Sequence, residues 1–98
     1  MEIEFAEPSL ALIETDEAGT TRLPVAVIKS VRRKLNVLRA APDDRTLRNW
    51  KSLHYEKLKG DREGERSIRI NKQYRMVFKL DNETDPQTIT ILAVEDYH

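Results

Sequence analysis

Cysteine is absent from this chain of 98 residues, so neither disulfide bonds nor thiolate metal ligands are available to it. We expect no metal site. No apolar run approaches the roughly 20 residues that a transmembrane helix needs, so no membrane contact is expected. The acidic start of the chain, with Glu2 and Glu4, also lacks the basic end of a signal peptide. These absences together predict a soluble protein of the reducing cytoplasm.

The motifs that mark several large enzyme classes are missing as well. The chain has no phosphate-binding loop, zinc-ligand spacing, nucleophile elbow or dinucleotide fingerprint. We therefore expect no cofactor. The length suffices for one compact domain and is too short for two, which predicts a single domain over residues 1–98.

The formal net charge is zero, but the charges are distributed unevenly along the chain. Residues 1–21 hold six acidic residues and residues 80–98 hold five, and neither segment contains Lys or Arg. All 17 basic residues lie in residues 22–79, where they outnumber the six acidic ones by 11. Such a segment suits a polyanionic partner if the fold gathers its charges on one face. Alternatively, the acidic ends pair with the basic middle in a mixed, solvated surface.

Alternating apolar and polar residues over 65–79 predict two antiparallel strands joined by a polar turn at 71–73. Because side chains on a strand alternate between its faces, a three-residue loop places Arg69 opposite Arg75. One face of the hairpin is then apolar (Ile68, Ile70, Met76, Phe78, Leu80), and the other carries Ser67, Arg69, Arg75 and Lys79, interrupted by Val77. Two opposed arginines destabilise a hairpin by up to about 1 kcal/mol, unless an anion lies between them or they splay into water.

The flanking segments predict an α+β fold. Ile3 and Phe5 alternate with acidic residues in a short edge strand at 2–6. A last strand at 88–96 is apolar on both faces, which predicts a central position in the sheet. Its expected faces are Ile89, Ile91 and Ala93 on one side and Leu92 and Val94 on the other.

Two helices are expected near the N-terminus. Ser9 is a candidate cap for a short helix that Gly19 stops. Pro24 suits the first turn of a long helix over 24–40, whose apolar stripe is Val27, Ile28, Val31, Leu35 and Leu38. Its opposite face carries Lys29, Arg32, Arg33 and Asn36 and is expected to be solvated. One capped helical turn follows at 43–48, after which Trp50, Leu53 and Tyr55 are expected to pack on the core.

Cationic and imidazole side chains are the groups left for chemistry. Transfer of a phosphodiester without a metal needs a base for the ribose 2′-hydroxyl, an acid for the leaving oxygen and fixed cations for the developing charge. An imidazole titrates near about 6.5 and can take either proton-transfer role. The candidates are Lys59, Arg69, Arg75, His54 and His98. Each signal is weak by itself, because a surface histidine is usually only exposed to solvent.

Four segments follow one another in a characteristic order: Leu58-Lys59-Gly60-Asp61-Arg62-Glu63-Gly64, Ser67-Ile68-Arg69-Ile70-Asn71, Tyr74-Arg75-Met76-Val77-Phe78 and Val94-Glu95-Asp96-Tyr97-His98. In this order they resemble the signature segments of the host-inhibition-of-growth (HigB) toxins, which belong to the RelE/ParE toxin superfamily. The resemblance runs from about residue 23 to residue 98.

This resemblance implies a RelE-like α+β domain in which two N-terminal helices pack on a small antiparallel sheet. It also implies the toxin of a type II toxin–antitoxin system, usually a ribosome-dependent endoribonuclease that cleaves mRNA in the decoding site. The implied partners are the ribosome, mRNA and a HigA-like helix-turn-helix antitoxin, with operator DNA bound only through the antitoxin complex. ParE-like relatives share the fold but inhibit DNA gyrase by binding, and this is the alternative reading.

The resemblance also assigns roles by position. Lys59, Arg69 and Arg75 resemble the phosphate-facing cations, and Asp96, Tyr97 and His98 resemble a terminal catalytic segment. Relatives with a catalytic histidine tend to place it two residues before the Leu-Lys-Gly segment, whereas His54 stands four before Leu58. Its role is therefore open, and could be absent or shared with Lys57. The further expected RNA contacts are Lys57, Arg62 and Lys79.

Overall fold

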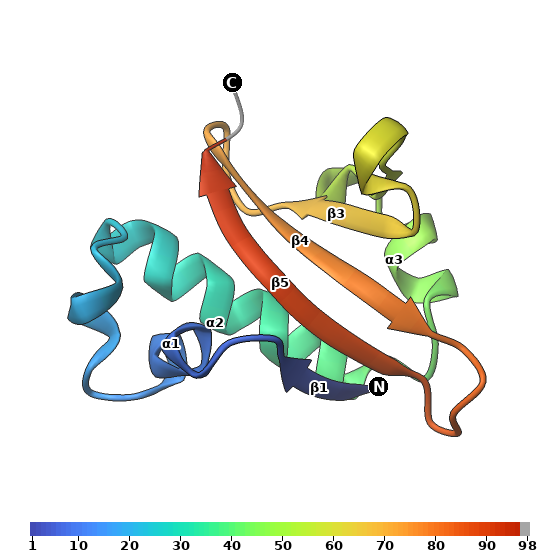
Figure 1. Cartoon of the computed structure of the whole chain (residues 1–98), viewed down its shortest axis with the longest axis horizontal. Helices are drawn as coiled ribbons and strands as arrows, with labels where there is room; N and C mark the ends of the chain where they lie inside the picture. The colour runs from blue at the N-terminus through green and yellow to red at the C-terminus, as the bar shows by residue number, and fades with distance from the viewer. Residues whose placement is uncertain (97–98) are drawn as a thin grey trace.

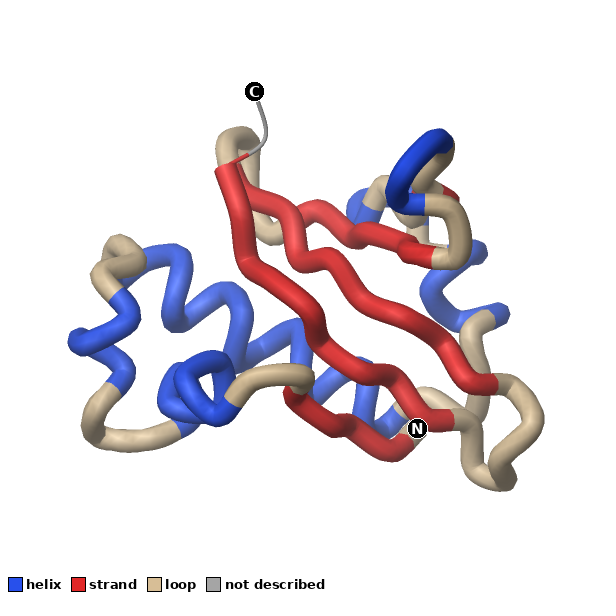
Figure 2. The backbone as a smooth tube through the Cα atoms, viewed as in Figure 1, coloured by secondary structure: helices blue, strands red, loops and turns tan. Residues whose placement is uncertain are grey.

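A five-stranded sheet forms the centre of the molecule, and a computed structural model describes residues 1–96 of the chain (Figures 1 and 2). Its strands are β1 (Glu2–Phe5), β2 (Glu56–Lys57), β3 (Glu65–Arg69), β4 (Tyr74–Asp81) and β5 (Thr88–Asp96). The order across the sheet is β1-β5-β4-β3-β2. β5 thus lies inside the sheet, as its two apolar faces predict, and β1 lies at an edge.

The direction of β1 differs from the all-antiparallel sheet that the resemblance implies. The four strands from β2 to β5 pair antiparallel, but β1 pairs parallel with β5, from Glu2 opposite Thr88 to Phe5 opposite Ile91. Alternation shows that a segment is a strand but not which way it runs beside its neighbour. The sheet is therefore mixed.

The long helix α2 (Val25–Ala40) packs against one face of the sheet, as Figures 1 and 2 show. Its predicted apolar stripe is buried and joins residues of β3, β4 and β5 in one core, with Leu35 and Leu38 fully inaccessible. Pro24 caps the start of the helix. At its other end the Met1 ammonium donates to the carbonyl of Ala41 at 2.6 Å, which fastens the start of β1 to this helix.

The first helical segment is shorter than expected and does not begin at Ser9. α1 (Pro8–Ala11) is one turn with Pro8 at its start and Glu7 as its cap residue, and two 3₁₀ turns, η1 (Leu12–Glu14) and η2 (Ala18–Thr21), follow it. Arg32 of α2 binds this segment: its Nε and Nη2 donate to the carbonyls of Ile13 and Thr15 at 2.7 and 2.9 Å. Arg32 is therefore not part of a merely solvated face.

The connection after α2 holds α3 (Arg45–Asn49) and the 3₁₀ turn η3 (Lys51–Leu53), close to the predicted helical turn. Leu53 is buried as expected. The centroid of the Tyr55 ring lies 6.2 Å from the centroid of the Phe78 ring. Trp50 is 42% exposed, so the expectation that it packs in the core is wrong. The tryptophan stands at the junction of α3 and η3, where the adjacent Leu47 and Leu53 take the inward positions.

A β-bulge in β5 changes the predicted faces of that strand. Val77 of β4 lies opposite Ala93, and the next residue, Phe78, lies opposite Ile91, which leaves Leu92 as the extra residue. Ala93 is thereby moved to the face away from Ile91, contrary to the expectation. Val94 instead lies opposite the buried Met76 and packs against the core.

No helix within residues 1–96 is long and apolar enough to span a lipid bilayer.

Candidate active site

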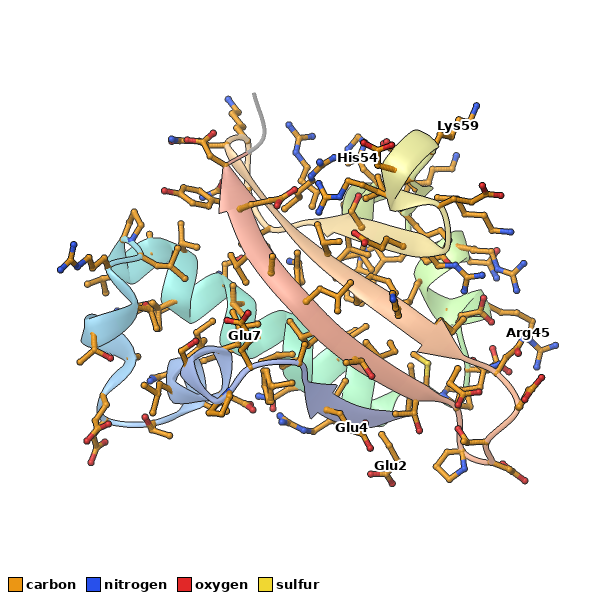
Figure 3. The ribbon with its side chains drawn as sticks, viewed as in Figure 1. Glu2, Glu4, Glu7, Arg45, His54 and Lys59 are labelled. Atoms are coloured by element: carbon orange, nitrogen blue, oxygen red, sulfur yellow. The ribbon has the colours of Figure 1, made fainter. Side chains whose placement is uncertain are left out.

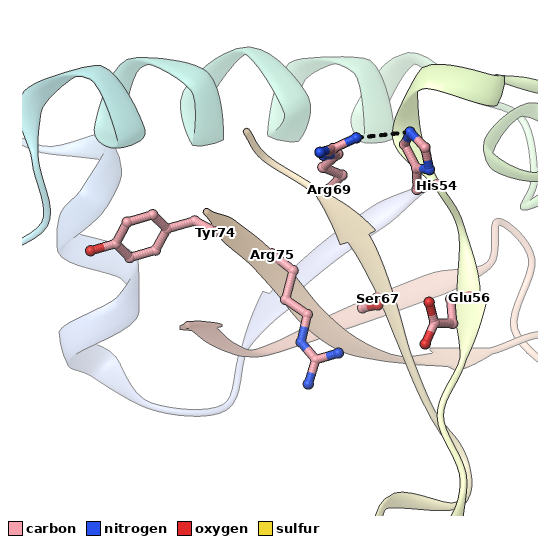
Figure 4. A pocket seen from close by; sticks show the side chains of 6 residues that line it. All are labelled: His54, Glu56, Ser67, Arg69, Tyr74 and Arg75. Carbon is pink, nitrogen blue, oxygen red and sulfur yellow. Dashed lines mark hydrogen bonds between the residues drawn. The ribbon is translucent and has the colours of Figure 1, made fainter. Parts of the chain in front are cut away.

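A small cavity of about 170 Å³ opens on the face of the sheet that carries the two arginines (Figure 4). Its lining comes from three strands and the residue that follows η3: His54, Glu56, Ser67, Arg69, Tyr74 and Arg75. Arg69 of β3 lies directly opposite Arg75 of β4, as the period of two predicts, and Glu56 of β2 lies opposite Ser67. We call these six residues the arginine pocket.

The turn of the hairpin fixes this register. Ile70 donates its backbone N–H to the Tyr74 carbonyl at 2.9 Å, which leaves the predicted loop of three residues. The Asn71 side-chain oxygen accepts from the backbone of both Gln73 and Tyr74 at 2.8 Å, so the asparagine closes the turn from within. Because the loop length is fixed, the two arginines lie opposite each other on the same side of the sheet.

His54 enters the pocket from the end of η3 in a left-handed backbone conformation, with φ 47° and ψ 50°. Arg69 Nη1 lies 3.0 Å from His54 Nε2, and Figure 4 marks this contact. A guanidinium has no acceptor atom, so in this hydrogen bond Arg69 donates and His54 Nε2 accepts. This contact points the Nε2 atom of the His54 ring at Arg69.

The opposed arginines do not splay into water. Arg69 donates from Nε to the Asn71 carbonyl at 3.2 Å, in addition to its contact with His54. Arg75 donates from Nε and Nη2 to one oxygen of Glu95, at 3.2 and 3.0 Å. Hydrogen bonds from Arg62 and Arg75 hold the pKa of the Glu95 carboxyl below its usual range, with the Arg62 bond the larger cause. The fold thus supplies a carboxylate on the Arg75 side of the pair.

The comparison with known protein families matches nearly the whole chain. A family model described as the RelE-like toxin of the type II toxin–antitoxin system HigB covers residues 3–95. The chain belongs to this family of HigB-like toxins. Toxin HigB-1 of Vibrio cholerae serotype O1 is 34% identical over 79 residues, which cover 81% of this chain and 83% of the relative. This supports the HigB interpretation over the ParE-like alternative.

Solved structures agree with this fold at low sequence identity. The YoeB/ParE toxin from Agrobacterium tumefaciens aligns with a TM-score of 0.61 at 17% identity, over 100% of both chains. A chain of the heterotetrameric YoeB-YefM toxin–antitoxin complex from Staphylococcus aureus aligns with a TM-score of 0.62 at 22% identity, over 100% of this chain and 97% of that one. The HigB-like toxin therefore shares a mixed α+β architecture with these proteins.

The structure brings only some of the expected site residues of this HigB-like toxin together. His54, Arg69 and Arg75 meet in the arginine pocket. Lys59 lies outside it: with Lys57 and Arg66 it lines a separate hollow beside η4 (Gly60–Arg62), and Figure 3 shows it projecting away from His54. The two lysines therefore do not share the position of His54.

The other expected residues surround the pocket. Arg62 donates to the carboxylates of Glu65 and Glu95, and Lys79 is exposed on β4 opposite Glu65. Asp96 ends β5 opposite Tyr74 and accepts from the Gln73 side chain at 3.0 Å. Tyr97 and His98 lie outside the described residues. Among residues 1–96, no group of three or more His, Asp or Glu side chains could hold a metal ion.

Glu56, Ser67 and Tyr74 also line the pocket, and none of them is among the site residues that the sequence predicts. Ser67 precedes Arg69 by two and shares its face, so the strand period already carried that signal. Glu56 could be placed only by knowing that β2, a strand of two residues, pairs with β3 at Ser67. Tyr74 opposes Asp96, a pairing that depends on the register of β4 and β5 and on the bulge between them.

Proposed function

We propose that this HigB-like toxin is a metal-independent endoribonuclease that cleaves mRNA in the ribosomal decoding site. The observation that carries the proposal is the contact of the His54 imidazole with Arg69, which lies opposite Arg75 in the same small pocket. Arginine pairs suit the two oxygens of a phosphodiester, and an imidazole lone pair suits proton abstraction. Cleavage would stop translation and growth.

The reaction begins when the ribose 2′-hydroxyl gives its proton to a base and attacks the adjacent phosphorus. The new O2′–P bond forms as the bond to the 5′-oxygen breaks, and the 5′-oxygen leaves with a proton from an acid. The products are a 2′,3′-cyclic phosphate and a 5′-hydroxyl. Arg69 and Arg75 neutralise the charge that develops on the phosphate oxygens during this step.

His54 is the base in this scheme. When a phosphate draws the Arg69 N–H toward itself, the lone pair on His54 Nε2 becomes available to the 2′-hydroxyl. Glu56, across the same pocket, is the second group able to accept that proton. We assign the acid role to His98, with Asp96 and Tyr97 orienting it at the end of the chain. Lys57, Lys59 and Lys79 contact the flanking RNA.

Membership of the HigB-like family supports the choice of partners. We propose that a HigA-like helix-turn-helix antitoxin binds and inhibits the toxin in the cytoplasm, where the ribosome and mRNA are its targets. Operator DNA is bound through the antitoxin rather than by the toxin itself. The Staphylococcus aureus toxin of similar fold was solved as a complex with its antitoxin, which supports an arrangement of this kind.

Mapping of RNA ends on programmed ribosomes tests the nuclease. We expect new 5′-hydroxyl ends with the unmodified toxin, and a loss of about 10²- to 10⁴-fold in rate for His54→Ala and for deletion of His98. Arg75→Ala should lose cleavage through the missing cation, and Glu56→Gln tests the second candidate base. Lys29→Glu, on the exposed side of α2, is the matched control and should cleave normally. Gyrase inhibition with no RNA cleavage would overturn the proposal.

A further inference from the structure

The Glu95 carboxylate lies between two guanidiniums that come from different parts of the chain. Its Oε1 accepts from Arg62 Nη1 at 2.7 Å and from Arg75 Nη2 and Nε at 3.0 and 3.2 Å. Its Oε2 accepts from Arg62 Nη2 at 3.4 Å. A single anion held by two guanidiniums is also the geometry in which proteins hold a phosphate.

Arg62 reaches this carboxylate across the sheet. It belongs to η4, the turn between β2 and β3, whereas Glu95 lies on β5, two strands beyond β3. Arg62 Nε also donates to Glu65 Oε1 at 3.1 Å, so the same guanidinium contacts carboxylates of β3 and β5. Val77, on that same face, is fully inaccessible yet separate from the main core, which shows that this part of the sheet is covered.

Several arginines lie side by side across β3, β4 and η4, and their mutual repulsion explains why an anion lies among them. Arg69, Arg75 and Glu95 lie opposite one another on β3, β4 and β5, and Arg62 adds a third guanidinium to this row. Guanidiniums gathered within hydrogen-bond distance of one oxygen repel one another unless that oxygen carries negative charge. The fold supplies the charge from its own chain, because the bulge at Leu92 sets the side of the sheet on which Glu95 lies.

We propose that Arg62 and Arg75 form a phosphate-binding site that Glu95 fills in the free toxin, and that a phosphate of the RNA substrate displaces the carboxylate. This inference rests on the proposed nuclease function. The tethered carboxylate competes at an effective concentration on the order of millimolar, so RNA free in solution displaces it poorly. RNA already held in the decoding site by other contacts displaces it readily, which makes cleavage depend on the ribosome.

Binding of a short RNA with a 2′-deoxy nucleotide at the cleavage position measures this competition without any cleavage. We expect Glu95→Gln to bind it about tenfold more tightly than the unmodified toxin at low salt, because the competing charge is gone while both arginines remain. Glu65→Gln is the matched control: it removes the other partner of Arg62, leaves Glu95 in place and should bind as the unmodified toxin does.

Inorganic phosphate provides a second readout. It should raise the melting temperature of Glu95→Gln and have less effect on the unmodified toxin, whose site is already filled. If Glu95→Gln does not fold, Glu95→Asp retains the charge but draws it back by one methylene, and should show a smaller gain in RNA affinity. Unchanged or weaker RNA binding by the folded variants, or equal stabilisation of all of them by phosphate, overturns the proposal. Tighter binding with no cleavage by any form would reject the nuclease and retain the phosphate site.

Discussion

His54 combines its place in the arginine pocket with an unfavourable backbone conformation. Its φ of 47° lies in the left-handed region, which costs a residue with a Cβ about 1 to 2 kcal/mol. The backbone N–H of His54 donates to the Lys51 carbonyl, and any residue at this position can make that bond. A strained residue whose side chain contacts Arg69 is typical of a position where function, rather than stability, determines the side chain.

We predict that His54→Gly is more stable than His54→Ala by about 1 kcal/mol, because only alanine retains a Cβ in the left-handed region. Both variants lose the imidazole and should lose ribosome-dependent cleavage to the same extent. Urea denaturation followed by circular dichroism gives the stabilities. Equal stability of the two variants would contradict the left-handed conformation, and cleavage by either would remove His54 from the reaction.

The sequence predicted the opposition of Arg69 and Arg75 correctly, because the period of a strand and the length of a loop are local properties. It could not predict how the two charges are accommodated. The contact of Arg69 with His54 spans 15 positions, and the pairing of Arg75 with Glu95 spans 20 and depends on a bulge in β5. Such contacts arise only when the strands are assembled into a sheet.

At the scale of the elements, α2 has more buried residues than α1 or α3, and its Leu35 has no exposed area. We predict that Leu35→Ala lowers the free energy of unfolding by roughly 2 to 5 kcal/mol, through the lost apolar contact and the cavity that remains. Chemical denaturation measures the change.

The control for this prediction is the double variant Lys29→Glu and Arg33→Glu, whose positions are exposed on the opposite side of α2. It should change the stability by less than about 0.5 kcal/mol for each site. Arg32 is unsuitable as a control, since it binds the carbonyls of Ile13 and Thr15. If the double variant lost more free energy of unfolding than Leu35→Ala, the side of α2 that carries Lys29 and Arg33 would be the one that packs on the core.

The sequence predicted best those helices and strands that have a long and regular hydrophobic pattern. The long apolar stripe of α2 and the alternation in β3, β4 and β5 were sufficient to locate them. The short segments were not: α1 ends after one turn, and the Ile13 carbonyl that follows it accepts from Arg32 of α2, a contact that the local sequence does not predict. Trp50 likewise gave no sign of its exposure, because a lone aromatic has no period.

For the molecule as a whole, the acidic ends and the basic middle of the chain pair in part within the fold. Glu14 accepts from both terminal nitrogens of Arg39, and Glu95 accepts from Arg62 and Arg75. Other acids stay at the surface: Figure 3 shows Glu2 and Glu4 along β1, at the sheet edge remote from His54 and Lys59. The zero net charge therefore reflects partial pairing within the fold, while Glu2 and Glu4 lie apart from His54 and Lys59.

These ion pairs predict how stability depends on pH. The hydrogen bond from Arg39 is the main cause that holds the pKa of the Glu14 carboxyl below its ordinary value, and Arg62 and Arg75 act likewise on the pKa of Glu95. A carboxyl whose pKa is lower in the folded state contributes stability above its unfolded pKa, and this contribution is lost as the pH falls through the folded pKa. The melting temperature should therefore be nearly constant near neutrality and fall below about pH 4.5, close to the ordinary pKa of a glutamate.

Glu14→Gln tests this assignment, with Glu4→Gln, an exposed acid of β1, as the matched control. At pH 7 we expect Glu14→Gln to melt below the unmodified toxin, because the bidentate contact with Arg39 loses its charge. On acidification the two melting temperatures should converge, since protonation removes the same charge from the unmodified toxin. Glu4→Gln should follow the unmodified toxin throughout. A gap between Glu14→Gln and the unmodified toxin that is as wide at pH 3 as at pH 7 would mean that the amide disrupts packing, and that the ion pair between Glu14 and Arg39 does not hold the N-terminal segment on α2.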